Sequence, residues 1–172
     1  DYAAACGRCF LTNRSEVDEG QLEDAVALLS ALPKEAGFLS RLYAPADDQD
    51  IQPGERAFYS RANAIALDTW RAGMDSLDEG LRTLLLGPLL SEASVHANTA
   101  GVFKGFYKDR RTGVGRFGGS GQDALGRILA PVRLRPPILS RFECDVQVHR
   151  GDAGALARTM PAVDLAYVDP PY

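Results

Sequence analysis

The sequence predicts an α/β fold in which a mostly helical and irregular stretch precedes a strand–helix–strand unit of an open parallel sheet. Apolar residues at helical spacing dominate the first half of the chain, whereas alternating and fully apolar runs appear only near its end. The chain has 172 residues, of which 45% are hydrophobic and 24% charged, as is ordinary for a globular protein. These observations together indicate the α/β class.

The helical part is predicted from apolar residues that recur at intervals of three and four positions. Helices are expected over residues 2–10, 19–31, 61–76 and 77–97, with an interruption near Gly87-Pro88. Cys6 and Cys9 share one face of the first helix, and a zinc site would need a second pair of ligands, so packed thiols are expected. Residues 44–54 are rich in Pro, Asp and Gln and predict a loop.

Two strands and the helix between them are predicted in the last thirty residues. Residues 144–149 alternate in polarity like a strand, and residues 164–168 are mostly apolar, as in a buried parallel strand. Residues 153–160 are expected to form the connecting helix. A right-handed crossover of this kind implies an open sheet, and it places Asp152 and Asp169 just beyond the strand ends, where ligands bind.

Charge is unevenly distributed along the chain. The net charge is −4, but residues 96–141 contain nine basic and two acidic side chains, so this stretch carries +7 and the remainder −11. Eight of the seventeen glycines lie between Gly101 and Gly126, where aromatic and basic residues alternate. The mixture predicts a surface that follows a sugar-phosphate backbone. A solvated loop with scattered charge is the competing interpretation.

Composition also bears on compartment and partners. The three cysteines are an odd number, which argues against a disulfide framework. No apolar run approaches the roughly 20 residues of a membrane span, and no secretory signal is recognisable. A reduced, cytoplasmic protein without a membrane partner is therefore predicted. The sequence carries no signal for an oligomeric state.

The chain ends on Asp169-Pro170-Pro171-Tyr172. An exocyclic amine of a nucleobase is a poor nucleophile, because its lone pair is delocalised into the ring. The Asp169 carboxylate and the Pro170 carbonyl suit the task of accepting hydrogen bonds from that amine, and the two prolines fix the backbone that positions them. Tyr172 suits stacking on a base that has left the duplex. An ordinary Asp-Pro turn is the competing interpretation.

This ending resembles motif IV of the amino-methyltransferases, in the Asp form typical of enzymes that act on adenine N6. Upstream, residues 98–119 resemble a segment of the Dam-like DNA adenine-N6 methyltransferases. The matched positions are Asn98, Phe103, Gly105, Gly113 and Phe117. Lys104 stands where that family usually has Asn, and the Asn-x-Pro that usually follows the phenylalanine is absent.

The resemblance implies part of a Rossmann-like sheet of an S-adenosylmethionine-dependent methyltransferase, with an inserted target-recognition region. Residues 1–18 would be a remnant helix of the core, residues 19–140 the insertion, and residues 141–172 the core with the catalytic motif. S-adenosylmethionine is the implied cofactor. The family's Phe-x-Gly-x-Gly cofactor turn is not found here, so an internal piece that is inactive alone is expected. Asp152 is the cofactor-binding candidate, and a helix N-cap is an equally weighted role.

The implied partner is double-stranded DNA, methylated at a specific sequence in a restriction–modification setting. Lys104, Lys108, Arg110, Arg111 and Arg116 are the candidates for binding phosphates, and Phe103, Phe106 and Tyr107 for filling the gap left by a flipped base. One alternative is a methyltransferase acting on RNA guanine N2 or on a protein glutamine, since related motifs serve there. Another is a nucleic-acid-binding module without catalysis.

Overall fold

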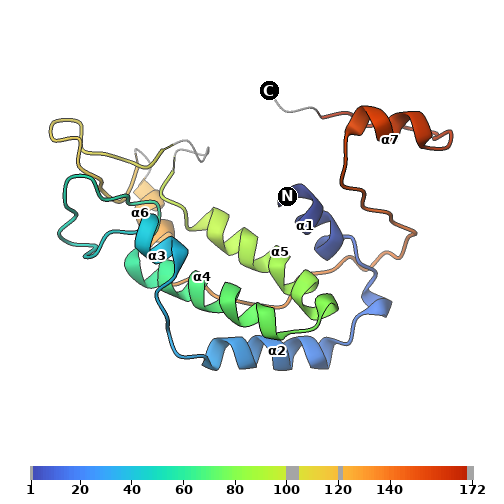
Figure 1. The fold of residues 1–172 in the computed structure, drawn as a ribbon, viewed down its shortest axis with the longest axis horizontal. Helices are drawn as coiled ribbons and strands as arrows, with labels where there is room; N and C mark the ends of the chain where they lie inside the picture. The colour runs from blue at the N-terminus through green and yellow to red at the C-terminus, as the bar shows by residue number, and fades with distance from the viewer. Residues whose placement is uncertain (1, 100–104, 120–121, 170–172) are drawn as a thin grey trace.

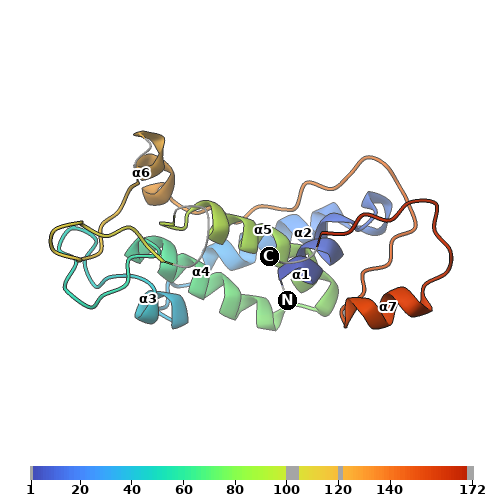
Figure 2. The same cartoon turned by 90° about the horizontal axis from the view of Figure 1, so that it is seen from above.

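The computed structural model describes residues 2–99, 105–119 and 122–169. Its elements are α1 (Tyr2–Phe10), η1 (Arg14–Glu16), α2 (Glu19–Ala31), α3 (Phe38–Leu42), α4 (Arg61–Gly73), η2 (Met74–Ser76), α5 (Glu79–Val95), α6 (Gln122–Leu129) and α7 (Ala153–Thr159). Helices α2, α4 and α5 lie alongside one another, and α1 packs on α5 (Figures 1 and 2). Helix α7 stands apart from this layer, at one end of the long axis.

The hydrophobic core lies between α2, α4 and α5. Leu29 of α2 and Leu67 of α4 are almost fully buried, as are Met74 of η2 and Leu85 of α5. Trp70 adds the largest aromatic surface to the same cluster. Burial of side chains of this size contributes about 1.5–3 kcal/mol each, so this cluster is what holds the helical layer together.

The three long helices of this layer each begin at a polar residue that caps their free N–H groups. The side chains of Asp18, Ser60 and Asp78 accept hydrogen bonds from the backbone N–H groups of Gln21, Asn63 and Leu81. The helices predicted over 2–10 and 19–31 are confirmed with the same bounds. The helix predicted over 61–76 divides into α4 and η2, and α7 confirms most of the helix predicted over 153–160.

The predicted interruption at Gly87-Pro88 is wrong, because α5 runs through both residues without a break. A proline inside a helix removes one N–H and leaves the carbonyl four residues earlier without its partner. Here that carbonyl belongs to Leu84, and it accepts a hydrogen bond from the Sγ of Cys9 on α1 at 3.0 Å. Burial raises the pKa of Cys9 to about 11, so the thiol keeps the proton that it donates.

Gly87 makes this contact between α1 and α5 possible. A Cβ atom at Gly87 would lie 2.5 Å from Cys9 Sγ and 2.8 Å from Cys9 Cβ, closer than real atoms approach. The absence of a side chain therefore lets the two helices meet at the level of the thiol. The expected packed cysteine is confirmed for Cys9, which is fully buried.

The predicted α/β sheet is wrong. The described residues contain helices and a single isolated antiparallel bridge, between Lys108 and Gly115, and no strand. Residues 144–149 and 164–168 have no neighbouring strand, and Leu165, Tyr167 and Val168 are each more than three-quarters exposed. Alternation and apolar character favour an extended backbone, but a sheet also requires a partner for each backbone hydrogen bond. No such partner lies among the described residues.

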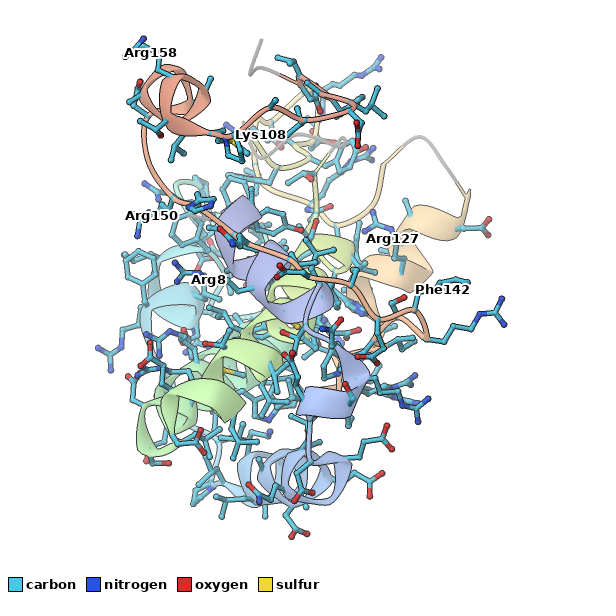
Figure 3. All side chains as sticks on the ribbon, turned by 90° about the vertical axis from the view of Figure 1, so that its right-hand side faces the viewer. Arg8, Lys108, Arg127, Phe142, Arg150 and Arg158 are labelled. Atoms are coloured by element: carbon cyan, nitrogen blue, oxygen red, sulfur yellow. The ribbon has the colours of Figure 1, made fainter. Side chains whose placement is uncertain are left out.

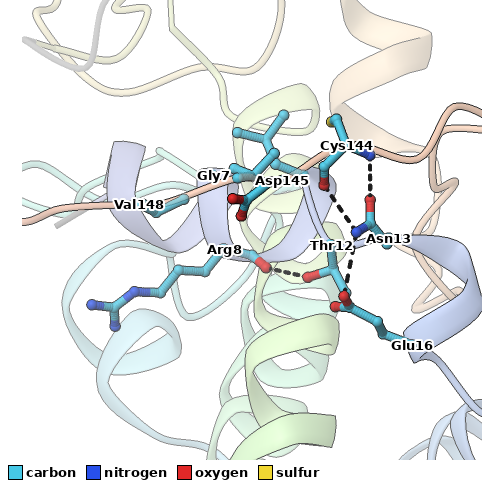
Figure 4. Close-up of a pocket in the computed structure, with 10 residues that line it drawn as sticks. Gly7, Arg8, Thr12, Asn13, Glu16, Cys144, Asp145 and Val148 are labelled. Atoms are coloured by element: carbon cyan, nitrogen blue, oxygen red, sulfur yellow. Dashed lines mark hydrogen bonds between the residues drawn. The ribbon is translucent and has the colours of Figure 1, made fainter. Parts of the chain in front are cut away.

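Side chains instead hold the start of this C-terminal segment against α1 and η1. Asn13 donates to the carbonyl of Cys144 at 2.9 Å and accepts from its N–H at 3.0 Å, so one amide replaces a strand partner (Figure 4). Ser15 Oγ donates to Glu143 at 2.6 Å. A hollow of about 260 Å³ lies between α1 and residues 144–148. None of the candidate site residues lines it.

Candidate functional site

Residues 106–117, here named the basic hairpin, lie at the end of the long axis opposite to α7 (Figures 1 and 2). The N–H of Asp109 donates to the carbonyl of Val114 at 2.8 Å, and the N–H of Arg116 donates to the carbonyl of Tyr107 at 3.0 Å. Gly113 closes the turn with φ of +70°, a conformation that favours glycine. Residues 106–117 thus form a defined antiparallel turn.

Asp109 organises the tip of the basic hairpin. One carboxylate oxygen accepts hydrogen bonds from the N–H groups of Thr112 and Arg111 at 2.8 and 3.0 Å, and from the Thr112 hydroxyl at 3.0 Å. These bonds, with the Thr112 N–H contributing most, lower the pKa of Asp109. The Asp109 carboxylate therefore stabilises the backbone of the turn. Arg110 and Arg111 are left exposed at its apex.

Asn98 fixes the second arm of the basic hairpin to the helical layer. Its fully buried side chain donates to the carbonyls of Ala57 and Arg116 at 2.7 and 2.8 Å and accepts from the N–H of Gly118 at 3.2 Å. Its own N–H donates to the carbonyl of Phe58 at 2.7 Å. One amide therefore joins two loops that are distant in sequence, and all of its hydrogen-bonding groups face backbone.

Asn63, at the first turn of α4, does the same for the segment that follows α6. Its buried amide donates to the carbonyls of Ile128 and Ala130 at 3.2 and 3.0 Å and accepts from the N–H of Val132 at 3.1 Å. Asn98 therefore holds the segment that follows the basic hairpin, and Asn63 holds the segment that follows α6. Both segments are fixed to the same end of the helical layer. The sequence resemblance included Asn98, but the bracing role of both amides was not predicted.

The aromatic residues of the basic hairpin face partly inward. Phe106 packs edge-on against Phe58 with ring centroids 5.0 Å apart, and Lys108 Nζ lies 5.1 Å from the centre of the Phe106 ring. Phe106 and Tyr107 are both half-buried. Filling the gap of a flipped base stays a prediction for these two. Phe103 and Lys104, the remaining candidates in this segment, lie outside the described residues.

The candidate catalytic segment follows α7 in the chain, and from α7 the backbone turns back toward the middle of the long axis (Figures 1 and 2). Asp169 is exposed and lies outside any helix, and Pro170, Pro171 and Tyr172 lie outside the described residues. Figure 3, viewed along the long axis from the α7 end, shows α7 with Arg158 apart from the helical layer. Asp169 lines neither of the two cavities beside the basic hairpin.

Asp152 is the N-cap of α7. Its carboxylate accepts from the N–H of Ala155 at 2.7 Å, which confirms the capping role. The residue is exposed, and the one carboxylate oxygen with a hydrogen-bond partner bonds to its own helix. An exposed carboxylate of this kind is a sparse site for a ligand as large as S-adenosylmethionine. Asp152 alone could therefore contact only a small part of that cofactor.

A cleft that the sequence did not predict lies beside the basic hairpin. It holds about 460 Å³ and is lined by residues 48–51 on one side and by Arg116, Phe117, Leu125 and Leu129 on the other. Residues 44–54 were predicted only as a loop. Because the two walls are distant in sequence, no pattern within either segment indicates the cleft.

Metal and membrane sites find no support within the parts of the chain that the structure describes. There, no three His, Cys, Asp or Glu side chains gather closely enough to hold a metal ion. The helices of the same ranges are all too short or too polar to cross a lipid bilayer.

Comparison with known proteins gives one informative similarity. No protein-family model matches the chain, and no solved structure matches it. The chain is 26% identical over 178 aligned positions to the Type II methyltransferase M.NlaIII of Neisseria lactamica. The alignment covers 99% of this chain and 46% of that protein, so the chain spans about half the length of the curated relative that it matches. Because the similarity extends through the helical layer, the basic hairpin and the α7 end, it supports a methyltransferase.

Proposed function

We propose that this chain is part of a methyltransferase that uses S-adenosylmethionine to modify adenine N6 at a specific sequence of double-stranded DNA, in a restriction–modification setting. The observation that carries the proposal is the basic hairpin, whose apex displays Arg110 and Arg111 from a braced backbone. The similarity to a Type II methyltransferase over 99% of the chain supports the reaction class.

The geometry of the basic hairpin suits a phosphate backbone. Arginine presents a planar fork of N–H donors that matches phosphate oxygens. Bracing by Asp109 and Asn98 reduces the conformational entropy that binding would otherwise cost. Lys108 and Arg116 are also exposed on the two arms, so the positive charge extends along the hairpin.

The chemical step is assigned to the end of the chain. In this proposal, Asp169 and the Pro170 carbonyl accept hydrogen bonds from the adenine amine, Pro171 fixes the turn, and Tyr172 stacks on the base. S-adenosylmethionine would supply the methyl group. DNA is an extended ligand, so an anchor at the basic hairpin and a reacting group near α7 can engage one duplex.

The product of the reaction tests this function. The protein carrying this chain, incubated with duplex DNA and S-adenosylmethionine labelled in its methyl group, is expected to place the label on N6-methyladenine in the digested DNA. Mass spectrometry of the nucleosides identifies the base. Label on N4-methylcytosine would refute the adenine assignment, and label only on RNA or protein would refute the DNA assignment.

The double variant Arg110→Ala with Arg111→Ala is expected to weaken DNA binding for every sequence. Each lost phosphate contact lowers the dependence of log affinity on log salt by about 0.9. The slope should therefore fall by about one to two units. Fluorescence anisotropy of a labelled duplex, titrated at several salt concentrations, measures it.

A matched control removes the same charge elsewhere. Arg14 and Arg71 are exposed arginines that already pair with Glu19 and Asp75, at 2.6 and 2.7 Å. The variant Arg14→Ala with Arg71→Ala should keep the wild-type slope. Equal slopes for wild type and the hairpin variant would remove the basic hairpin from the DNA-binding surface.

A further inference from the structure

The loop of residues 46–52, here named the acidic loop, lies beside the basic hairpin at the same end of the molecule (Figures 1 and 2). Ile51 Cγ2 lies 3.4 Å from the place that a Cβ atom would occupy on Gly115, so the two loops are packed against each other. The cleft of about 460 Å³ opens between them. A ligand held by the hairpin arginines would therefore also meet the acidic loop.

Hydrogen bonds to Glu55 and Arg61, which lie outside the acidic loop, fix its backbone conformation. The Glu55 carboxylate accepts from the N–H groups of Ala46 and Gln52, both at 2.8 Å, which closes the loop at its base. The same bonds, that from Gln52 first, lower the pKa of Glu55. Asp48 accepts from the N–H of Arg61 at 2.8 Å and ties the loop to the start of α4.

Gln49 is an exposed polar residue of the acidic loop, and it lines the cleft. Its backbone N–H is held by Asp47 at 2.8 Å, whereas its amide has no hydrogen-bond partner among the described residues. It lines both the cleft of about 460 Å³ and an adjoining hollow of about 350 Å³. A braced backbone with a free amide is the arrangement expected of a recognition residue, because the backbone entropy is already lost.

The walls of the cleft suit the edge of a base pair. Leu125 and Leu129 of α6 are 45% and 43% exposed and form an apolar side together with Phe117. Apolar side chains contact the methyl group of thymine, and a glutamine amide pairs with the N6 and N7 of adenine, its partner base. The carboxylates of the acidic loop repel phosphates, which favours contact with the groove floor over the backbone.

We infer that Gln49 is a specificity-determining residue, which reads the adenine edge of an A·T pair in the major groove while the basic hairpin holds the flanking phosphates. The inference rests on the proposed function, since it requires a DNA duplex as the ligand. It assigns sequence reading to the acidic loop and positioning to the basic hairpin. The adenine that Gln49 reads belongs to the recognition sequence and need not be the methylated base.

Selection from a pool of duplexes with a randomised centre tests this inference on the full chain. Wild type should enrich a motif that contains an A·T pair. Gln49→Ala should lose the preference at that pair by about 5- to 150-fold, while the other positions of the motif persist. Gln49→Glu should shift the same position toward C·G, because a carboxylate accepts from cytosine N4 but cannot donate to adenine N7.

Gln52→Ala is the matched control within the same loop. The Gln52 side chain donates to the carbonyl of Asp50 at 3.1 Å and does not line the cleft, so its loss should leave the enriched motif unchanged. An unchanged motif for Gln49→Ala, or equal losses for both variants, would overturn the role of Gln49. If wild type enriched no duplex at all, the proposed function would fail instead, so the two failures are distinguishable.

Discussion

Replacing Asp169 by alanine is expected to lower the rate of methylation by about 10²–10³-fold while leaving DNA affinity nearly intact. In the proposed mechanism its carboxylate accepts a hydrogen bond from the adenine amine, which raises the electron density on that nitrogen and so its nucleophilicity. An interaction made mainly in the transition state affects the rate more than binding. Removal of one such group lowers the rate by about 10²–10³-fold. Transfer of labelled methyl groups at saturating DNA, with anisotropy for affinity, separates the two effects.

Asp164→Ala supplies the control for this experiment. Asp164 is an exposed acid of the same C-terminal segment and has no assigned part in the reaction. Its loss should leave the rate within a small factor of wild type. Asp169→Asn keeps the size of the side chain and one accepting oxygen, so it should retain more activity than alanine. Full activity of Asp169→Ala would exclude the carboxylate from the chemical step.

The largest effect on stability is expected from Asn98→Leu. Leucine has the same branched heavy-atom skeleton as asparagine but cannot hydrogen-bond, so the carbonyls of Ala57 and Arg116 and the N–H of Gly118 would lose their partner. Unpaired buried groups cost about 1–3 kcal/mol each. Allowing for partial relaxation, the free energy of unfolding should fall by about 3 kcal/mol. Urea denaturation followed by circular dichroism measures this loss.

A second readout of Asn98→Leu reports on the basic hairpin itself. Release of the second arm should expose the peptide bonds after Arg110 and Arg111 to trypsin, so cleavage there should be faster than in wild type at the same urea concentration. Asn13→Leu is the matched control, because Asn13 makes similar hydrogen bonds to Cys144 at a more exposed place. Its loss should cost less than about 1 kcal/mol. Comparable losses of unfolding free energy for the two variants would contradict the bracing role of Asn98.

The helices were predictable because their signals are local. In α2, the apolar spacing of Leu22, Ala25 and Leu29 and the cap at Asp18 all fall within one segment. The sheet was predicted wrongly because alternation within residues 144–149 specifies an extended backbone and not the strand that would pair with it. Asn13 pairs with Cys144 from 131 residues away, and no pattern near either residue indicates this.

The candidate site divides in the same way. The positive charge of the basic hairpin and the carboxylate at Asp169 are properties of composition and motif, so the sequence alone indicated them. The bracing by Asn98 and the proximity of Gln49 to the hairpin depend on which loops meet in space. An asparagine that pairs with three backbone groups of two separate loops looks, in the sequence, like any polar residue in a turn.

The contact between α1 and α5 makes positions 9, 84, 87 and 88 energetically dependent on one another. The thiol of Cys9 compensates for the N–H that Pro88 lacks, and it fits only because residue 87 has no side chain. With any other residue at 88 the backbone N–H of that residue could bond to the Leu84 carbonyl, and the Cys9 thiol would share this acceptor instead of being its replacement donor. Changes at such sites are non-additive, with coupling energies of about 0.5–3 kcal/mol. During divergence, substitutions at positions 9, 87 and 88 should therefore accumulate together. A substitution at one of these positions alone would cost stability that changes at the others restore.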